Sequence, residues 1–355
     1  MKNRIRKLSY YVLLSIVMCF ILTACKTAPN NLKETSTTEQ ESAKNNSQND
    51  EVEGALNDVN RYNEIIDRSQ DEGKFSICFL DLPYIQNAED KSGDSSLLIS
   101  PDGKVMLIDA GLSECAPRII SFLEDLGIEK IDYFVASHPH IDHIGGFFAI
   151  ADKFEIGKIY RNKVEYTTNT YKKFAKELEN THIPVEYLEE GDEITFGDHI
   201  QVKIYNPPTE IVYPEDYPKN STQFINDTSI TMKFIYGEST ALFAGDLYIT
   251  RERDLIRTYG EELQADIAKA NHHGADTSNS NRWIKNLQAK VVVAMNDKID
   301  GMSVYNNFVK AGTDYYNTAL NGYVKVIMDN EKNYTVINQY DNWNNVTTET
   351  GSKTN

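Results

Sequence analysis

One segment, Ser137–Gly146, constrains this chain more than any other. It places His138, His140, Asp142 and His143 within six positions, directly after an apolar run. Imidazole and carboxylate groups are the side chains that bind borderline divalent metals. The whole chain has only seven histidines, so an ordinary polar loop is not expected to hold three of them. The segment therefore predicts a metal site at the end of a β-strand and, with it, a hydrolase.

The spacing within this segment divides its ligands into two sets. His138 and His140 alternate by two, so their side chains can point the same way on an extended segment. Asp142 and His143 begin the next element and can face a second position. Gly145-Gly146 lets the backbone turn closely around bound ions. One motif therefore supplies ligands for two metal positions.

Two later segments also place polar groups after an apolar strand. His272 and His273 follow the expected strand 266–270, and Asp246 follows the expected strand 241–244. Neighbouring strands end at one edge of a sheet, so these side chains can join the first motif there. A carboxylate such as Asp246 can bridge two metals, although Gly-Asp also ends strands as a simple turn.

A further strand-end acid is Asp109, which follows an apolar run in Leu107–Gly111. Two roles are open for it. Its carboxylate can orient a ligating histidine from outside the ligand set, or it can cap the helix that follows.

The N-terminus has the pattern of an exported lipoprotein. Residues 1–24 carry four basic groups and no acidic group, and their apolar run ends Leu22-Thr23-Ala24 before Cys25. This is the order of a secretory signal peptide, and Leu-x-Ala-Cys resembles a bacterial lipobox. The alternative is an uncleaved membrane anchor, but the run of about 15 residues is shorter than the ~20 needed to span a membrane, which favours the lipoprotein. We expect cleavage before Cys25, lipidation of its thiol, and a location on the outer face of the bacterial cell membrane.

The rest of the chain divides by composition. Residues 25–60 are rich in Asn, Ser, Thr, Gln and Glu, which predicts a disordered tether. Residues 61–345 suit one large domain, and 346–355 form a polar tail. The formal net charge is −17; the basic signal and the acidic tether cancel, so this charge lies on the domain. Such a surface argues against broad non-specific binding of nucleic acid.

Short β-type runs alternate with helical patterns along the domain, which predicts sheets covered by helices. Strands are expected at 75–80, 96–100, 105–108, 131–136, 200–205, 229–235, 241–244, 266–270, 290–294 and 323–328. Helices are expected at 114–126, 144–153, 170–180, 249–259, 279–287 and 305–310.

The order of these motifs resembles the metallo-β-lactamase fold superfamily. It is most similar to the branch that holds the extracellular hydrolase domain of the competence DNA-uptake protein ComEC and its stand-alone relatives. The resemblance covers about residues 75–330. The matching segments are Phe79-Leu80-Asp81-Leu82, Gly93-Asp94, Leu107–Gly111, Ser137–Gly146, Asn226-Asp227-Thr228-Ser229, Gly245-Asp246 and His272-His273-Gly274-Ala275.

This resemblance implies an α/β fold, an αββα sandwich of two mixed β-sheets packed face to face with helices outside. It also implies two divalent metal ions, with zinc first and manganese as the alternative. The expected metal ligands are His138, His140, Asp142, His143, Asp246 and His272. The expected catalytic residues are Asp142, the alternative proton acceptor, and His273. Which of His272 and His273 ligates is left open. The residues expected to contact the ligands without binding metal themselves are Asp81, Asp94, Asp109 and Asn226.

The chain departs from the branch in three places. Ten extra residues, Pro83–Ser92, extend a loop that borders the active site in the family, and Ala275 stands where the branch has serine. The histidine that many members carry between the first motif and Gly-Asp is also not evident. His182 and His199 lie in that interval, and we expect neither to ligate. Asn206, Asn226 or Asp227 could approach the metal instead.

The resemblance favours a phosphodiester substrate, either nucleic acid or a wall polymer. We therefore expect a nuclease or phosphodiesterase that uses a metal-bound hydroxide. The alternatives are a phosphodiesterase acting on teichoic acid, a β-lactam hydrolase, and a surface lipoprotein that binds metal without catalysis. The membrane is expected to be contacted through the lipid anchor only, and any part in DNA uptake needs a partner protein.

Overall fold

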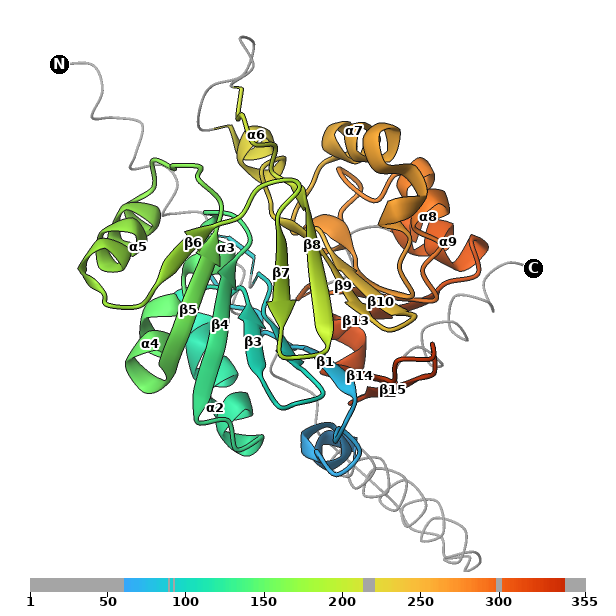
Figure 1. Cartoon of the computed structure of the whole chain (residues 1–355), viewed down its shortest axis with the longest axis horizontal. Coiled ribbons are helices and arrows are strands. Elements are labelled where there is room, and N and C mark those ends of the chain that lie inside the picture. The colour runs from blue at the N-terminus through green and yellow to red at the C-terminus, as the bar shows by residue number, and fades with distance from the viewer. Residues whose placement is uncertain (1–60, 89, 92, 213–220, 298–301, 342–355) are drawn as a thin grey trace, which may run out of the picture. The chain divides into compact units, whose positions relative to one another are not determined.

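Two mixed β-sheets lie at the centre of the described part of the chain (Figure 1). The first sheet runs in the order β15 (Tyr334–Asn338), β14 (Val324–Met328), β1 (Phe75–Phe79), β2 (Ser96–Ile99), β3 (Val105–Ile108), β4 (Lys130–Ala136), β5 (Glu155–Arg161) and β6 (Val185–Tyr187). The second runs in the order β13 (Asp314–Asn317), β12 (Val291–Ala294), β11 (Ile267–Lys269), β10 (Ser239–Phe243), β9 (Thr231–Tyr236), β8 (Ile200–Asn206) and β7 (Glu193–Phe196).

The computed structural model describes residues 61–341 except 89, 92, 213–220 and 298–301. All of them belong to one unit, Gly54–Asn355. The predicted signal peptide, the predicted tether with Cys25 and the predicted polar tail fall outside the described residues. Within the described ranges, no helix combines the length and the hydrophobicity needed to cross a membrane.

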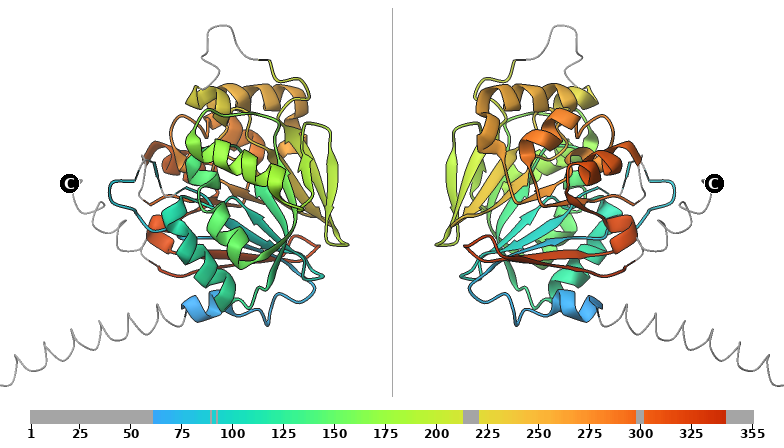
Figure 2. Two further views of the ribbon diagram at one scale, coloured as in Figure 1. Left: turned by 90° about the vertical axis from the view of Figure 1, so that its left-hand side faces the viewer. Right: turned by 90° about the vertical axis from the view of Figure 1, so that its right-hand side faces the viewer.

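Helices cover the outer face of each sheet (Figures 1 and 2). Those over the first sheet are α2 (Ala116–Asp125), α4 (Phe147–Lys153) and α5 (Asn169–Asn180). Those over the second are α7 (Ile249–Tyr259), α8 (Asn281–Leu287) and α9 (Met302–Lys310). Shorter helical turns are η1 (Ser113–Cys115), α3 (Ile141–Ile144), α6 (Thr222–Asn226), η2 (Gly260–Leu263), η3 (Asn271–Gly274) and α10 (Thr318–Asn321).

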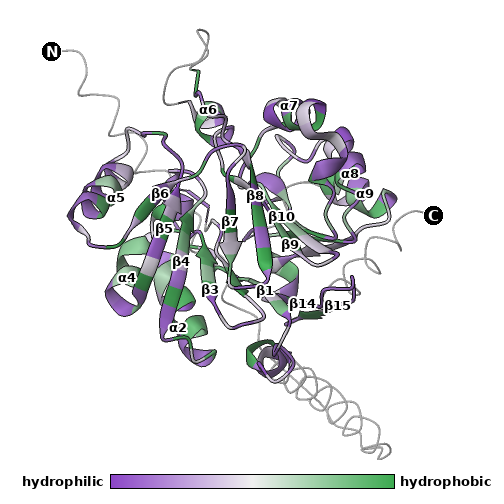
Figure 3. Ribbon diagram, viewed as in Figure 1, coloured by the Kyte–Doolittle hydropathy of each residue, from purple (hydrophilic) through white to green (hydrophobic). Residues whose placement is uncertain are grey.

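Three apolar layers hold this arrangement together. Between the sheets, Phe75 and Phe79 of β1 pack with Phe234 and Phe243 of β9 and β10. The two outer layers join each sheet to the buried sides of its helices, and Figure 3 shows helices such as α2 and α4 carrying both hydrophobic and hydrophilic residues. Burial of apolar area stabilises such layers at about 25 cal/mol per Å². The predicted αββα sandwich is confirmed.

The helix predicted at 144–153 is wrong at its start, because the chain forms α3 and then α4 with Gly145-Gly146 between them. A Cβ at Gly145 would lie 2.5 Å from the Ile141 carbonyl oxygen, and one at Gly146 would lie 2.2 Å from that of Ala110. These glycines therefore permit close approach of the backbone that precedes η1, which draws the first motif against the end of β3.

The predicted strands all exist, but five further strands were missed. Four of them, β6, β15, β7 and β13, are the edges of the two sheets. Edge strands pair on one side only and carry polar, partly exposed residues, so their sequences lack a clear apolar alternation. The fifth, β5, holds Glu155 and Lys158 and lies inside the first sheet.

Candidate metal centre

The first motif is buried where the parallel strands β3 and β4 end. His138, His140, Asp142 and His143 are each at most 8% exposed. Strand β4 ends at Ala136, His140 caps α3, and the last two residues lie within that single turn. Because β3 and β4 run parallel, the strand that bears Asp109 ends at the same edge.

His138 and His140 present ring nitrogens to one another. Nε2 of His138 lies 2.9 Å from Nδ1 of His140, which agrees with side chains that alternate by two. Burial lowers the pKa of both rings, and that of His138 falls well below its ordinary value. Only neutral imidazole ligates a metal, so both rings are in the form that binds one.

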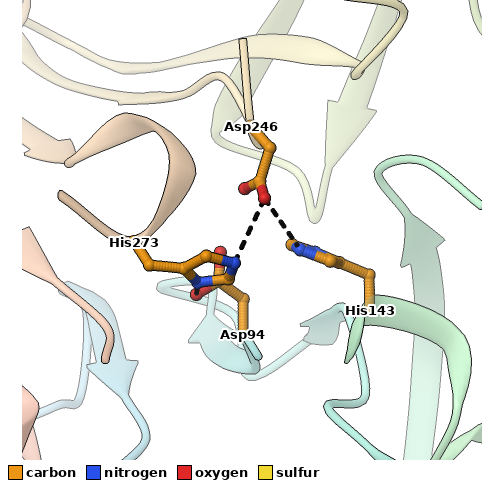
Figure 4. A group of neighbouring side chains, drawn as sticks. All are labelled: Asp94, His143, Asp246 and His273. Atoms are coloured by element: carbon orange, nitrogen blue, oxygen red, sulfur yellow. Dashed lines mark hydrogen bonds and ion pairs between the residues drawn. The ribbon is translucent and has the colours of Figure 1, made fainter. Parts of the chain in front are cut away.

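A second set of four ligand atoms converges next to this pair. Nε2 of His273 lies 3.1 Å from Oδ2 of Asp246 and 3.2 Å from Oδ2 of Asp142. Nε2 of His143 lies 3.3 Å and 3.7 Å from the same two oxygens. Ligands about 2.1 Å from a tetrahedral metal are about 3.4 Å apart, so the four atoms fit one divalent cation. Figure 4 shows Asp246, His143 and His273 pointing toward one another from different segments.

Without metal, His143 and His273 are protonated and the carboxylates beside them are ionised, so both rings would release a proton on binding a cation. Nε2 of His143 is buried without a hydrogen-bond partner. Burial acts to lower the pKa of His143 and His273, but nearby carboxylates, Asp246 foremost, outweigh it and hold both pKa values well above the ordinary value. Burial acts to raise the pKa of Asp142 and Asp246, yet the two histidines bring both below the ordinary value. The site is thus rich in ionised carboxylates, which bound metals would neutralise.

Two carboxylates contact these histidines at Nδ1, on the side of the ring away from the converging Nε2 atoms. Asp109 Oδ2 lies 2.8 Å from Nδ1 of His143, and Asp94 Oδ1 lies 2.9 Å from Nδ1 of His273. Both contacts leave Nε2 facing the centre, the arrangement that orients metal-binding histidines. Asp109 also accepts hydrogen bonds from the backbone and hydroxyl of Ser137, so the structure favours the orienting role over a helix cap. Asp94 itself belongs to a buried group with His143, Asp246 and His273 whose ligand atoms lie within 4.8 Å of one another, and its second oxygen contacts Nζ of Lys269.

Lys269 is a residue of this site that sequence reasoning missed. Its Nζ lies 2.5 Å from Asp94 Oδ2 and 3.5 Å from Asp246 Oδ1, and it donates to the carbonyl oxygens of Gly245 and Ala270. Burial acts to lower the pKa of Lys269, but the two carboxylates raise it, so the ammonium is charged. A lysine inside an otherwise apolar strand was the signal that could have revealed it.

The two adjacent histidines divide between the centre and its rim. Nε2 of His273 is 3.1 Å from Asp246 Oδ2, whereas Nε2 of His272 is 4.0 Å from it. The Nδ1 atom of His272 contacts the Thr277 hydroxyl at 2.7 Å. The sequence prediction placed His272 among the ligands and His273 among the catalytic groups; the structure brings His273 closer to Asp142 and Asp246.

Glu252 of α7 holds this histidine turn and was also missed. The turn is strained, because His272 and His273 have φ values of 49° and 55°. The buried Glu252 carboxylate accepts hydrogen bonds from the Asn271 side chain at 2.9 Å and from the backbone of Asn279 at 2.6 Å. These bonds tie the turn to a rigid helix, so they position the histidines without touching them.

No further histidine completes the site. His182 and His199 are exposed, and they complete the seven histidines of the chain. Asn206 uses its side chain elsewhere, donating to the carbonyl oxygens of Asp227 and Ser229. Asp227 accepts from the backbone of Tyr248, and burial raises its pKa to about 7.

Asp81 lies apart from the described ligand atoms. Its carboxylate accepts from Arg118 at 3.1 Å. Burial raises the pKa of Asp81 to about 6, against the opposing effect of Arg118. Within the described residues, Asp81 therefore makes no direct contact with the ligands that it was expected to support.

A cavity of about 210 Å³ opens above the ligand atoms. Beside Asp142, Asp246 and both residues of the histidine turn, it is lined by Asp90, Lys91, His140, Ile141, Tyr166, Thr168, Thr222 and Asn226. Lys91 belongs to the extended loop Pro83–Ser92, of which residues 89 and 92 are outside the described set. The loop therefore contributes to the wall of the cavity, as the family resemblance led us to expect.

Comparison with known proteins matches residues 90–212 to the metallo-β-lactamase superfamily. The chain is similar to competence protein ComA of Neisseria gonorrhoeae, with 24% identity over 200 residues, 56% of this chain and 25% of that protein. It is also similar to exodeoxyribonuclease YycJ of Bacillus anthracis, with 31% identity over 129 residues, 36% of this chain and 46% of that protein. The chain thus spans a quarter to a half of these relatives.

Among solved structures, the chain is similar to the metallo-β-lactamase fold protein YhfI of Bacillus subtilis. The two share 17% identity at a TM-score of 0.44, over 68% of this chain and 95% of that one.

Proposed function

We propose that this chain, which carries a metallo-β-lactamase superfamily domain, hydrolyses phosphodiesters as a metal-dependent nuclease or phosphodiesterase. The observation that carries the proposal is the convergence of two adjoining sets of ligand atoms beneath one cavity. A protein that only stores or displays metal has no need of an open cavity over the ligands. Hydrolysis is supported by the similarity to an exodeoxyribonuclease, and the phosphodiester substrate goes one step further.

The residues present fit two divalent cations. His138 and His140 would hold one, His143, His273 and Asp142 would hold the other, and Asp246 would lie between them. Divalent cations in such a site supply Lewis acidity, which makes water a nucleophile near neutral pH and stabilises negative charge on phosphoryl oxygens. Zinc suits the imidazole-rich set, and manganese is the alternative.

The remaining groups position and balance this site. Asp94 and Asp109 fix the orientation of His273 and His143 through their Nδ1 atoms. Asp142 lines the cavity, and its Oδ2 lies 3.2 Å from Nε2 of His273; despite burial, the two histidines hold its pKa below the ordinary value, so it is ionised and ready to bind a cation. Strain and burial are concentrated in these residues, which is typical of a preorganised active site.

A nucleic acid is the phosphodiester that we favour. The similar protein YycJ is named an exodeoxyribonuclease, and ComA is named a competence protein. A cavity of about 210 Å³ can take one phosphodiester group and its flanking atoms, but not a duplex. We therefore propose DNA as the substrate, with one phosphodiester group entering the cavity, and a DNA-uptake system as the setting.

Metal analysis and turnover of the purified full-length chain test this function. We expect two equivalents of zinc or manganese, and hydrolysis of bis-p-nitrophenyl phosphate and single-stranded DNA that stops when a chelator removes the metal. Absence of both bound metal and turnover would refute the enzyme. Cleavage of a cephalosporin alone would replace the phosphodiester by a β-lactam.

We further propose that the protein is a lipoprotein on the outer face of the cell membrane. The support is the order of charge, apolar run and Cys25 in residues 1–25. Replacement Cys25→Ser removes the thiol that would be acylated, so we expect labelled palmitate to be incorporated by the wild type and not by this variant. Equal labelling of both would contradict the anchor, and a cysteine elsewhere, Cys78→Ser, provides the control.

A further inference from the structure

Asn226 is a buried residue beside the cavity, and its side chain makes no hydrogen bond in the described structure. It ends α6, is 1% exposed and lines the cavity together with Asp142, Asp246 and His272. Neither Nδ2 nor Oδ1 of its side chain has a hydrogen-bond partner. Buried side-chain amides in folded proteins are almost always paired, so this amide is placed to meet a ligand.

The backbone around Asn226 is held firmly. Its carbonyl oxygen accepts from the backbone of Ser229 at 2.9 Å, and the Thr228 backbone donates to Ile225 at 3.1 Å. The hydroxyl of Ser229 in turn accepts from the backbone of Asp246 at 3.1 Å. The backbone that carries the amide is therefore fixed relative to Asp246, and it does not depend on a loose loop.

Comparison with Asn206 shows what an asparagine used for structure looks like in this protein. The Asn206 side chain donates twice to backbone carbonyls and accepts from Arg251 Nε at 2.7 Å. Asn226 makes none of these bonds. Hydrogen bonding by the Asn226 side chain acts to lower the pKa of Tyr248, although burial, the larger effect, raises that pKa; no hydrogen bond of normal geometry joins the two side chains.

We propose that Nδ2 of Asn226 donates a hydrogen bond to a phosphoryl oxygen of the substrate, so that Asn226 positions and stabilises the reacting group. This inference rests on the proposed phosphodiester function. An unpaired buried N–H group is rarer than an unpaired oxygen, so the donor defines the partner as an acceptor such as a phosphoryl oxygen. A role as metal ligand would use Oδ1, a weak ligand among imidazoles, and would leave the donor unpaired.

Three variants of the full-length chain test this role, and each is analysed for metal content and thermal stability. Asn226→Ala removes the donor. Asn226→Asp keeps the shape but replaces the donor by a charged acceptor that repels phosphate. Asn180→Ala, at the exposed end of α5, is the matched control and should behave as the wild type.

We expect Asn226→Ala to lower kcat and kcat/KM for bis-p-nitrophenyl phosphate together by about 100-fold, as for loss of one donor to a developing oxyanion. Asn226→Asp should be slower still. Both should retain two metals. Wild-type rates for Asn226→Ala would overturn the inference, and loss of one metal would make Asn226 a ligand instead.

Binding of inorganic phosphate to the metal-loaded protein, measured by calorimetry, separates this inference from the proposed function. We expect Asn226→Ala to weaken this binding about tenfold. If the wild type binds phosphate, hydrolyses no phosphodiester and loses affinity in the variant, the function fails but the contact stands. If phosphate binding is unchanged in the variant while the wild type is active, the contact fails alone.

Discussion

Replacement Asp246→Asn is expected to lower kcat/KM at least about 10³-fold, equivalent to about 4 kcal/mol of transition-state stabilisation. Asp246 Oδ2 is the one oxygen that lies within 3.3 Å of Nε2 in both His143 and His273. Asparagine keeps the shape but loses the charge that attracts the cations. The bound metal should therefore fall from two equivalents to one or fewer, measured by mass spectrometry on the purified protein.

A control at another aspartate makes this result specific. Asp254 lies on α7 and pairs with Arg257 at the surface. Replacement Asp254→Asn removes the same charge at a distance from the ligands, so its rate and metal content should match the wild type. If Asp246→Asn kept both metals and a rate within threefold of the wild type, Asp246 would have no place between the metals.

The convergence of the ligands was predictable from the sequence because it follows from topology. Each apolar strand carries the residues that follow it to an end of its sheet, and on that basis the motifs were expected to meet. The structure corrects the reason, because β4 before His138 lies in the first sheet, whereas β10 and β11 before Asp246 and His273 lie in the second. The ligands therefore meet where the ends of two sheets face each other and not at one edge. Alternation by two also predicted that His138 and His140 face the same way. These inferences need only the local period and the position of the strand ends.

The finer arrangement of the site could not be predicted in this way. The choice between His272 and His273 depends on two successive left-handed residues, which are held by Glu252 from a helix 20 residues earlier. The pairing of Asp94 with His273 joins residues 179 positions apart. Such contacts depend on how the two sheets pack, and no local pattern encodes that packing.

Lys269 illustrates the same limit and leads to the second large effect that we expect. In the metal-free protein, replacement Lys269→Met should lower the free energy of unfolding by about 3–5 kcal/mol, because it leaves buried carboxylates without their cation. The residues concerned are Asp94 and Asp246, whose side chains are at most 2% exposed. The melting temperature in the presence of a chelator should fall on the order of 10 °C.

Metal binding should reverse part of this loss. Lys269 pairs with the buried carboxylates of Asp94 and Asp246, so the variant site carries one more uncompensated negative charge than the wild type. Divalent cations neutralise that charge and stabilise the folded state by mass action. Addition of zinc should therefore raise the melting temperature of Lys269→Met by more than it raises that of the wild type.

A second strand lysine shows whether the effect belongs to the site. Lys233 of β9 is half-buried, and its Nζ donates to the carbonyl oxygen of Glu262 at 2.7 Å. Replacement Lys233→Met leaves no buried carboxylate unpaired, so its cost should be about 1 kcal/mol and independent of zinc. If Lys269→Met and the wild type had the same melting temperature in the presence of a chelator, Lys269 would not be the cation that balances these carboxylates. Other positively charged groups would then have to neutralise them.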